Sequence, residues 1–138
     1  RADFSYVCLD QQYSRVNTPQ SVLELAQSCN HGNLQDHELK LRLHRALFGQ
    51  QMWDKRCDTL SGGERMRLCL CSLMIANHVP DLFVLDEPTN NLDLSSLAIL
   101  TRTVRNYRGT LLVVSHDDNF TREIGITRTV GLESPPAE

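Results

Sequence analysis

The chain has 138 residues, which is enough for one hydrophobic core of modest size. Its formal net charge of −3 gives no basic field for nucleic acid, and no apolar run approaches the roughly 20 residues that span a bilayer. Five cysteines occur without a CxxC spacing, so we expect thiols rather than disulfides or a metal site. These features predict a cytoplasmic protein with no direct membrane insertion.

The first part of the chain predicts one strand followed by two helices. Residues 4–9 are rich in aromatic and apolar side chains, as in a strand. Residues 22–29 are predicted to form a short helix with Ser21 as its N-cap. Residues 36–48 are predicted to form a second helix that is stopped by Gly49, with an apolar face made of Leu39, Leu43, Ala46 and Leu47.

The remainder of the chain alternates helices with short apolar strands. Glu64 is predicted to begin a helix that extends to about His78, with an apolar stripe made of Met66, Cys69, Leu70, Leu73 and Met74. Residues 82–85 and 111–114 are continuous apolar runs, which are typical of strands buried on both faces. A helix is expected over residues 94–107, one or two helical turns over 117–124, and a last strand over 127–132.

This alternation predicts an α/β fold with a parallel sheet. We expect residues 1–132 to form the domain, with a helical lobe at about residues 13–78 inserted into the α/β core. Residues 133–138 include two consecutive prolines, and we expect this tail to be disordered.

Two adjacent carboxylates follow the first buried apolar run. Asp86 and Glu87 are therefore expected at the C-terminal edge of the sheet, where α/β proteins bind ligands. Because side chains alternate along a strand, the two acids can take different roles. Asp86 suits Mg²⁺ held through its water shell, and Glu87 can reach an attacking water as a base.

A Gly-rich turn precedes the helix that begins near Glu64. The backbone N–H groups of Ser61, Gly62 and Gly63, together with the positive end of the helix dipole, are suited to binding an anion. The Ser61 hydroxyl adds a donor.

Two further polar residues end strands at the same predicted edge. From the end of the second buried run, His116 can hydrogen-bond a γ-phosphate and orient the catalytic carboxylate. Gln11 ends the first strand, where a neutral amide can contact Mg²⁺ or the attacking water. The adjacent Gln12 is the alternative for this position.

The motifs, taken in order, resemble those of an ATP-binding-cassette (ABC) ATPase domain. Leu60 to Glu64 reads LSGGE and resembles the signature motif, and residues 82–86 resemble Walker B. Residues 86–93 read DEPTNNLD, which is close to the DEPTNHLD pattern of the ABC-F subfamily, whereas transporter domains more often read DEPTSALD. The chain without its tail resembles the C-terminal two-thirds of such a P-loop-NTPase-like nucleotide-binding domain.

The resemblance implies a role for each motif. Glu87 matches the catalytic glutamate, His116 the switch histidine, Gln11 the Q-loop glutamine and Asp93 the D-loop aspartate. Asp86 and Gln11 would hold Mg²⁺. The nucleotide held by an opposite domain would contact Ser61, Gly62, Gly63 and Glu64. ATP and Mg²⁺ are the implied ligands, and a second ABC domain, in tandem or as a dimer, is the implied partner.

The sequence contains no GxxxxGK[ST] phosphate loop, and its only lysines are Lys40 and Lys55. In the family this loop lies upstream of the Q-loop. With no initiator Met, the chain resembles an excised piece, and we predict that it is inactive as an ATPase on its own.

Three functions stay open from the sequence. The first is an ATPase domain of an ABC-F protein acting on the ribosome. The second is the ATPase subunit of an ABC transporter, docked on a membrane permease through the helical lobe. The third is a non-catalytic module, which the presence of Glu87 and His116 argues against.

Overall fold

A computed structural model describes residues 4–9, 13–77, 80–90 and 92–131 of the chain. Its strands are β1 (Tyr6–Leu9), β2 (Leu82–Asp86) and β3 (Thr110–Val114). Its helices are α1 (Val22–Cys29), α2 (Asp36–Arg45), α3 (Gly62–Ile75), α4 (Leu94–Asn106) and α5 (Asp118–Glu123). Three short 3₁₀ turns, η1 (Ser14–Val16), η2 (Gln50–Met52) and η3 (Cys57–Thr59), connect them.

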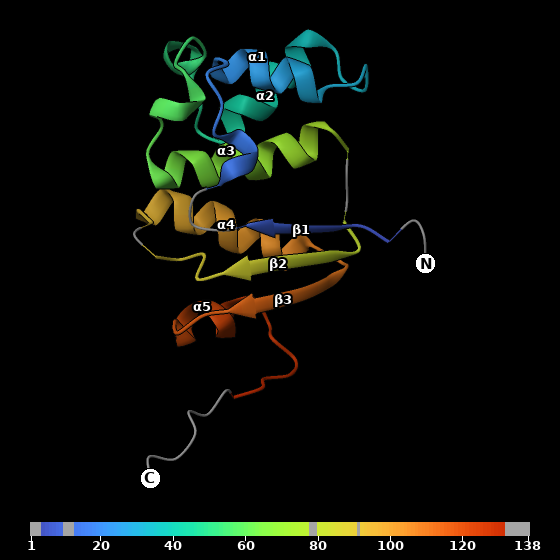
Figure 1. Ribbon diagram of the computed structural model, residues 1–138, viewed down its shortest axis with the longest axis vertical. Coiled ribbons are helices and arrows are strands. Elements are labelled where there is room, and N and C mark those ends of the chain that lie inside the picture. The colour runs from blue at the N-terminus through green and yellow to red at the C-terminus, as the bar shows by residue number, and fades with distance from the viewer. Residues whose placement is uncertain (1–3, 10–12, 78–79, 91, 132–138) are drawn as a thin grey trace.

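The three strands form one parallel sheet in the order β1-β2-β3, as Figure 1 shows by its three arrows pointing the same way. Leu9 pairs with Leu85, and Asp86 pairs with Val114, so the C-terminal ends of the strands meet at one edge. The helices α1 and α2 lie farthest from the sheet, with α3 between them and α4. The predicted α/β fold with a parallel sheet is confirmed.

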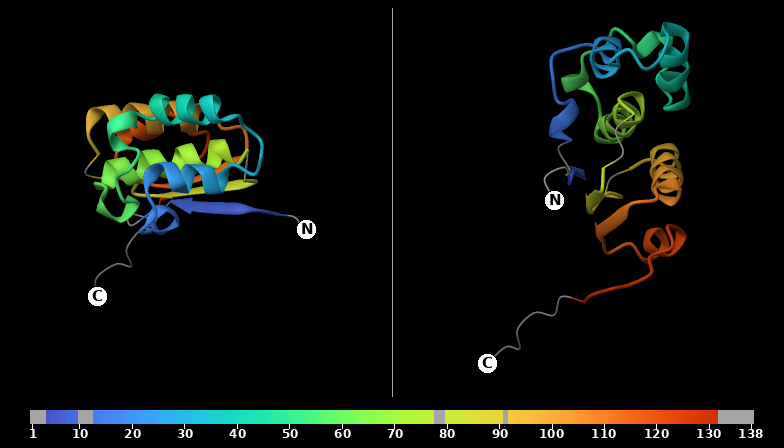
Figure 2. Two further views of the ribbon diagram at one scale, coloured as in Figure 1. Left: turned by 90° about the horizontal axis from the view of Figure 1, so that it is seen from above. Right: turned by 90° about the vertical axis from the view of Figure 1, so that its right-hand side faces the viewer.

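One face of the sheet is covered by helices and the other is open among the described residues. Figure 2 (right) shows α4 and α5 on the same side of the strands. Side chains on the covered face are buried, as in Val7, Leu9, Phe83 and Leu85. The opposite face exposes Tyr6, Cys8, Leu112 and Val114.

The prediction that residues 82–85 and 111–114 are buried on both faces was therefore wrong. In β2, Phe83 and Leu85 are buried while Leu82 and Val84 are only half-buried, and in β3 no side chain is fully buried. Helices of the described chain contact one face of the sheet, so only alternate side chains enter the core.

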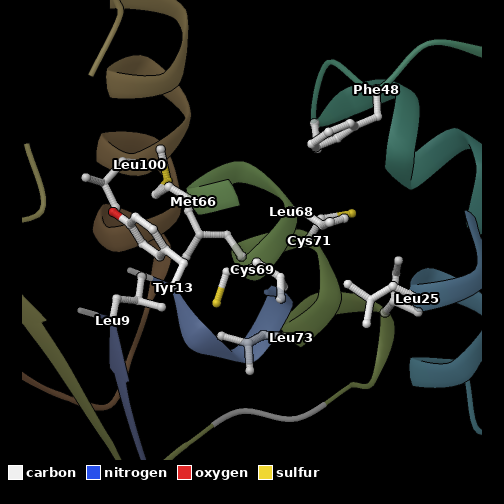
Figure 3. Packing of buried hydrophobic residues seen from close by; sticks show 14 of the residues in the cluster. Leu9, Tyr13, Leu25, Phe48, Met66, Leu68, Cys69, Cys71, Leu73 and Leu100 are labelled. Atoms are coloured by element: carbon white, nitrogen blue, oxygen red, sulfur yellow. The ribbon is translucent and has the colours of Figure 1, made fainter. Parts of the chain in front are cut away.

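The helix α3 forms the centre of the core. It contacts α1, α2 and α4, and every residue from Met66 to Leu73 is buried. In Figure 3, Leu68 and Cys71 of α3 face Phe48 and Leu25, while Met66 lies near Leu100. The prediction of a single apolar stripe was too narrow, because α3 is surrounded, and Met74 is exposed.

Local sequence signals set most helix ends. Ser21 caps α1 as predicted, through a reciprocal pair of hydrogen bonds with Glu24. The second helix was predicted to reach residue 48, but α2 ends at Arg45. Gly49 was predicted to stop this helix, but the left-handed residue is Leu47 (φ 68°), whereas Gly49 has a φ of −70°. Leu47 is exposed, and Phe48 is buried in the core.

The chain after β3 differs from its prediction in one element. The helical turns at 117–124 are present as α5, but residues 127–131 form no strand. This segment leads away from the sheet (Figure 1), so it finds no partner for a hydrogen-bond ladder, and Val130 is 73% exposed. The helix predicted at 94–107 is confirmed as α4.

All five cysteines lie within the described residues, and all are thiols, as predicted. Burial raises the pKa of Cys57 to about 11 and that of Cys71 to about 12, so both are poor nucleophiles at neutral pH. No helix in the described part of the chain is long and apolar enough to cross a membrane. The boundaries of the helical lobe at about 13–78 and the disorder of residues 133–138 stay predictions.

Candidate functional site

The acidic pair lies where β2 leaves the sheet. Asp86 is the last residue of β2 and its side chain is exposed. Glu87 has a left-handed backbone (φ 47°), which costs a non-glycine residue about 1–2 kcal/mol. Its backbone N–H donates a 2.7 Å hydrogen bond to the carbonyl of Val114 and so extends the β2–β3 pairing by one residue. The two carboxylates differ in burial, since Asp86 is exposed and Glu87 is half-buried.

The predicted histidine lies beside the second acid of this pair. The Nε2 atom of His116 is 3.3 Å from Oε1 of Glu87. The Glu87 side chain is 19% exposed, whereas the His116 side chain is 97% exposed. The two residues follow neighbouring parallel strands, so the sheet itself brings them together. We call Asp86, Glu87 and His116 the acidic edge.

The Gly-rich turn is the first turn of a helix rather than a loop before it, because α3 begins at Gly62 and not at Glu64. Ser61 is the N-cap: its Oγ accepts from the N–H of Glu64 at 3.2 Å, and Oε1 of Glu64 accepts from the N–H of Ser61 at 2.9 Å. Since this Oγ acts as an acceptor inside the cap, its proton can still be donated outward. Ser61 and Gly62 are exposed.

Gly63 packs against the start of α4. A Cβ added to Gly63 would lie 2.8 Å from Oδ1 of Asp93 and 2.9 Å from Oγ of Ser96. Asp93 is the N-cap of α4 and accepts a 3.3 Å hydrogen bond from the N–H of Ser96. Hydrogen bonds from Ser96, with a smaller contribution from Arg67, lower the pKa of Asp93. The predicted signature glycine and D-loop aspartate of one chain are therefore neighbours.

Sequence reasoning gave no role to Arg67, which joins three elements. Its Nε donates to Oγ of Ser96 at 3.1 Å, and its Nη1 donates to the backbone carbonyl of Ala46 at 2.9 Å. The guanidinium also stacks over the ring of Phe48 at 5.1 Å. An arginine among the apolar residues of α3 was the signal that could have revealed it. We call Ser61, Gly63, Arg67, Asp93 and Ser96 the α3–α4 junction.

The acidic edge and the α3–α4 junction lie at the same end of the molecule. Figure 1 shows the N-terminal ends of α3 and α4 on the side toward which the strand arrows point. The predicted Gln11, and its alternative Gln12, lie outside the described residues. The described site residues therefore fall into two groups, one on the sheet and one on the helices.

The donor set fits part of a magnesium–nucleotide site. Carboxylate oxygen is the ligand that Mg²⁺ prefers, and Mg²⁺ uses one or two carboxylates while keeping several waters. Asp86 meets that need. Within the described residues no group of three or more His, Cys, Asp or Glu side chains could hold a metal by itself. The phosphate-binding lysine loop is absent from the sequence.

Comparison with known proteins identifies a family and several relatives of similar sequence. The family model described as "ABC transporter" matches residues 4–90. The energy-dependent translational throttle protein EttA of Haemophilus influenzae is 37% identical over 117 residues, covering 83% of this chain and 20% of that protein. ABC transporter F family member 5 of Arabidopsis thaliana is 40% identical over 96 residues, covering 70% of this chain and 13% of that protein.

The fold also has relatives among solved structures. A dimeric ATP-binding cassette in a post-hydrolysis state, bound to ADP and Pi, superimposes with a TM-score of 0.62 at 21% identity. The match covers 87% of this chain and 56% of that chain. The present chain spans about a fifth of the length of the relatives named EttA.

Proposed function

Because this chain belongs to the ABC transporter family, we propose that it is the part of an ATPase domain that carries the signature loop and the catalytic carboxylate. The complete protein would bind and hydrolyse ATP. The observation that carries this proposal is the pair of Glu87 and His116, 3.3 Å apart at the ends of two neighbouring parallel strands.

The acidic edge would supply the chemistry of hydrolysis. Glu87, whose side chain is mostly buried, would accept a proton from an attacking water or orient that water. His116 contacts Glu87 through Nε2, and its other ring nitrogen, Nδ1, would donate to a phosphate oxygen when the imidazole is protonated. Asp86 would hold Mg²⁺, which supplies positive charge opposite the phosphates when it is bound.

The α3–α4 junction would serve a second nucleotide-binding domain. Ser61 and Gly62 are exposed at the N-terminus of α3, and this end of a 14-residue helix favours an anion. With no phosphate loop in this chain, the phosphates would be held mainly by the loop of another domain or of an upstream segment. Each charge-assisted hydrogen bond to a phosphate contributes roughly 1.5–3 kcal/mol, so losing several such bonds removes most nucleotide affinity.

We also propose that the protein acts in translation, in the cytoplasm and on the ribosome. The support is the name and similarity of EttA and the F-family pattern at residues 86–93. The test is whether the protein sediments with ribosomes in an ATP-dependent manner. Co-purification with membranes instead would favour the alternative, an ATPase subunit docked on a membrane permease.

The test of the ATPase proposal is phosphate release by the longer protein that contains this chain. Glu87→Gln keeps the size of the side chain but removes the base, so we expect a loss of 100-fold or more, in the range of general-base catalysis. Glu123→Gln, an exposed change in α5, is the matched control and should retain activity. Equal activity of Glu87→Gln and Glu123→Gln would refute the role of Glu87.

A further inference from the structure

A groove lies between α2, α3 and α4, on the side of the molecule away from the acidic edge. It has a volume of about 820 Å³. Its floor is mainly apolar and comes from α3, β2 and α4: Leu70, Leu73, Met74, Phe83 and Ile99. The residues that α3 contributes lie between Arg67 and Met74 and span roughly 10 Å at 1.5 Å per residue, so the groove is about two helical turns long.

Arginines surround this floor. The rim contains Arg42 and Arg45 from α2, Arg102 from α4, and Arg108 from the turn before β3. No carboxylate is present among the described residues that line the groove, and none of these four arginines has an ion-pair partner in the described part of the chain. The chain as a whole has a net charge of −3, so this groove is a local reversal of charge.

The elements explain part of this charge. The groove lies at the C-terminal ends of α2, α3 and α4, where the helix dipoles are negative and basic side chains are favourable. That effect accounts for basic residues in the last turns of α2 and α4. It does not explain Arg108, which lies beyond α4, or the exposed methionine on the floor, since Met74 is 52% exposed.

We propose that this groove docks an acidic amphipathic helix of a partner protein. Its apolar side chains would lie on the floor, with the flexible Met74 adapting to them, and its Asp and Glu residues would pair with the arginine rim. The apolar floor favours a peptide helix over RNA, because a phosphate backbone has no apolar face to bury. The site is independent of ATP, so it does not rest on the proposed function.

The experiment measures binding of a synthetic probe to the 138-residue chain by fluorescence anisotropy. The probe is a helical peptide with leucines at i, i+3, i+4 and i+7 and glutamates on both flanks. A peptide with lysines in place of the glutamates is its control. We expect the acidic peptide to bind, the lysine peptide not to bind, and higher salt to weaken binding.

Charge reversal then locates the site. Arg42→Glu combined with Arg102→Glu should weaken binding roughly 10-fold or more, since two attractions become repulsions. Arg122→Glu combined with Arg128→Glu changes the net charge equally at exposed positions outside the groove, and should change binding less than 2-fold, about the size of a surface effect. Met74→Glu, at an exposed position, should also weaken binding and tests the floor without disturbing the core.

Three results would overturn the proposal. In the first, the acidic peptide does not bind to the 138-residue chain, although circular dichroism verifies that the chain is folded. Another is equal weakening by the two double variants, which would indicate non-specific attraction. The third is tighter binding of a double-stranded RNA hairpin that displaces the peptide and depends on Arg42 and Arg102, which would make the groove an RNA-binding surface.

Discussion

The α3–α4 junction and the acidic edge differ in how much of their geometry is held by surrounding side chains. At the junction, Arg67 is buried, Gly63 is packed against Asp93 and Ser96, and the caps of two helices are complete. At the acidic edge, the His116 side chain is 97% exposed and lies 3.3 Å from Glu87. Substitutions at the junction should therefore alter folding and function together, whereas those at the edge should alter function alone.

The largest expected effect is on ATP hydrolysis, and it comes from a substitution at the acidic edge. His116→Ala should lower the rate of ATP hydrolysis by the longer protein about 100-fold. This factor is at the lower end of the rate contributions that acid–base groups make. Its stability should change by less than about 0.5 kcal/mol, because the side chain is almost fully exposed. His37→Ala, another exposed histidine, is the control. A large fall in melting temperature for His116→Ala would show that the acidic edge is also a folding element.

Arg67→Met tests the α3–α4 junction, where we expect a loss of stability. The change removes donors to Ala46 and Ser96 and leaves buried acceptors, so we expect a loss of about 2 kcal/mol in the free energy of unfolding. Urea denaturation measures it. Arg105→Met, which removes an exposed arginine, should stay within about 0.5 kcal/mol. Equal stability of the two variants would contradict the structural role given to Arg67.

Two adjacent glycines give a matched pair. Gly63→Ala would place a methyl group 2.8 Å from Oδ1 of Asp93, and such overpacking costs about 1–3 kcal/mol. Gly62→Ala meets nothing within 4 Å, and alanine is the better helix former, so this variant should be neutral or more stable by up to about 1 kcal/mol. Thermal melts of both variants decide the matter; an identical effect of the two would mean that α3 and α4 are not in close contact here.

The smallest effect concerns the cap of α4 and depends on pH. Asp93→Ala should cost about 1 kcal/mol at neutral pH, as for other N-caps. Because the folded state lowers the pKa of Asp93, its stabilisation is present above the unfolded pKa and is lost as pH falls through the folded pKa. The stability difference between Asp93→Ala and the unchanged chain should therefore shrink on acidification. A difference that is constant down to pH 2 would exclude this linkage.

The sequence predicts the motifs better than their surroundings. Short apolar runs followed by acids identify β2 and the acidic edge, and Ser21 marks the start of α1. Burial on both faces of the sheet was overestimated, because apolar runs do not reveal how many layers of the described chain cover a sheet. Leu47 takes a left-handed conformation although Gly49 is two residues away, since packing of Phe48 into the core decides where the turn falls.

The contacts of Arg67 and Gly63 could not be predicted for a related reason. Both depend on the distance between α3 and α4, which are separated by β2 in the chain and meet only in the folded molecule. Local patterns define a helix and its cap, but they do not define which helix packs against it. The proximity of Glu87 and His116 is easier to predict from the sequence, because parallel strands bring their C-terminal ends to one edge of the sheet.

One measurement tests the central claim, that this chain supplies the catalytic edge and signature loop but not the phosphate-binding loop. Mg-ATP is titrated by calorimetry into the 138-residue chain and into a version extended upstream to include a phosphate loop. We expect binding near micromolar, about 8 kcal/mol, only for the extended protein. Micromolar binding by the 138-residue chain would contradict the claim and place the main phosphate contacts within the residues described above.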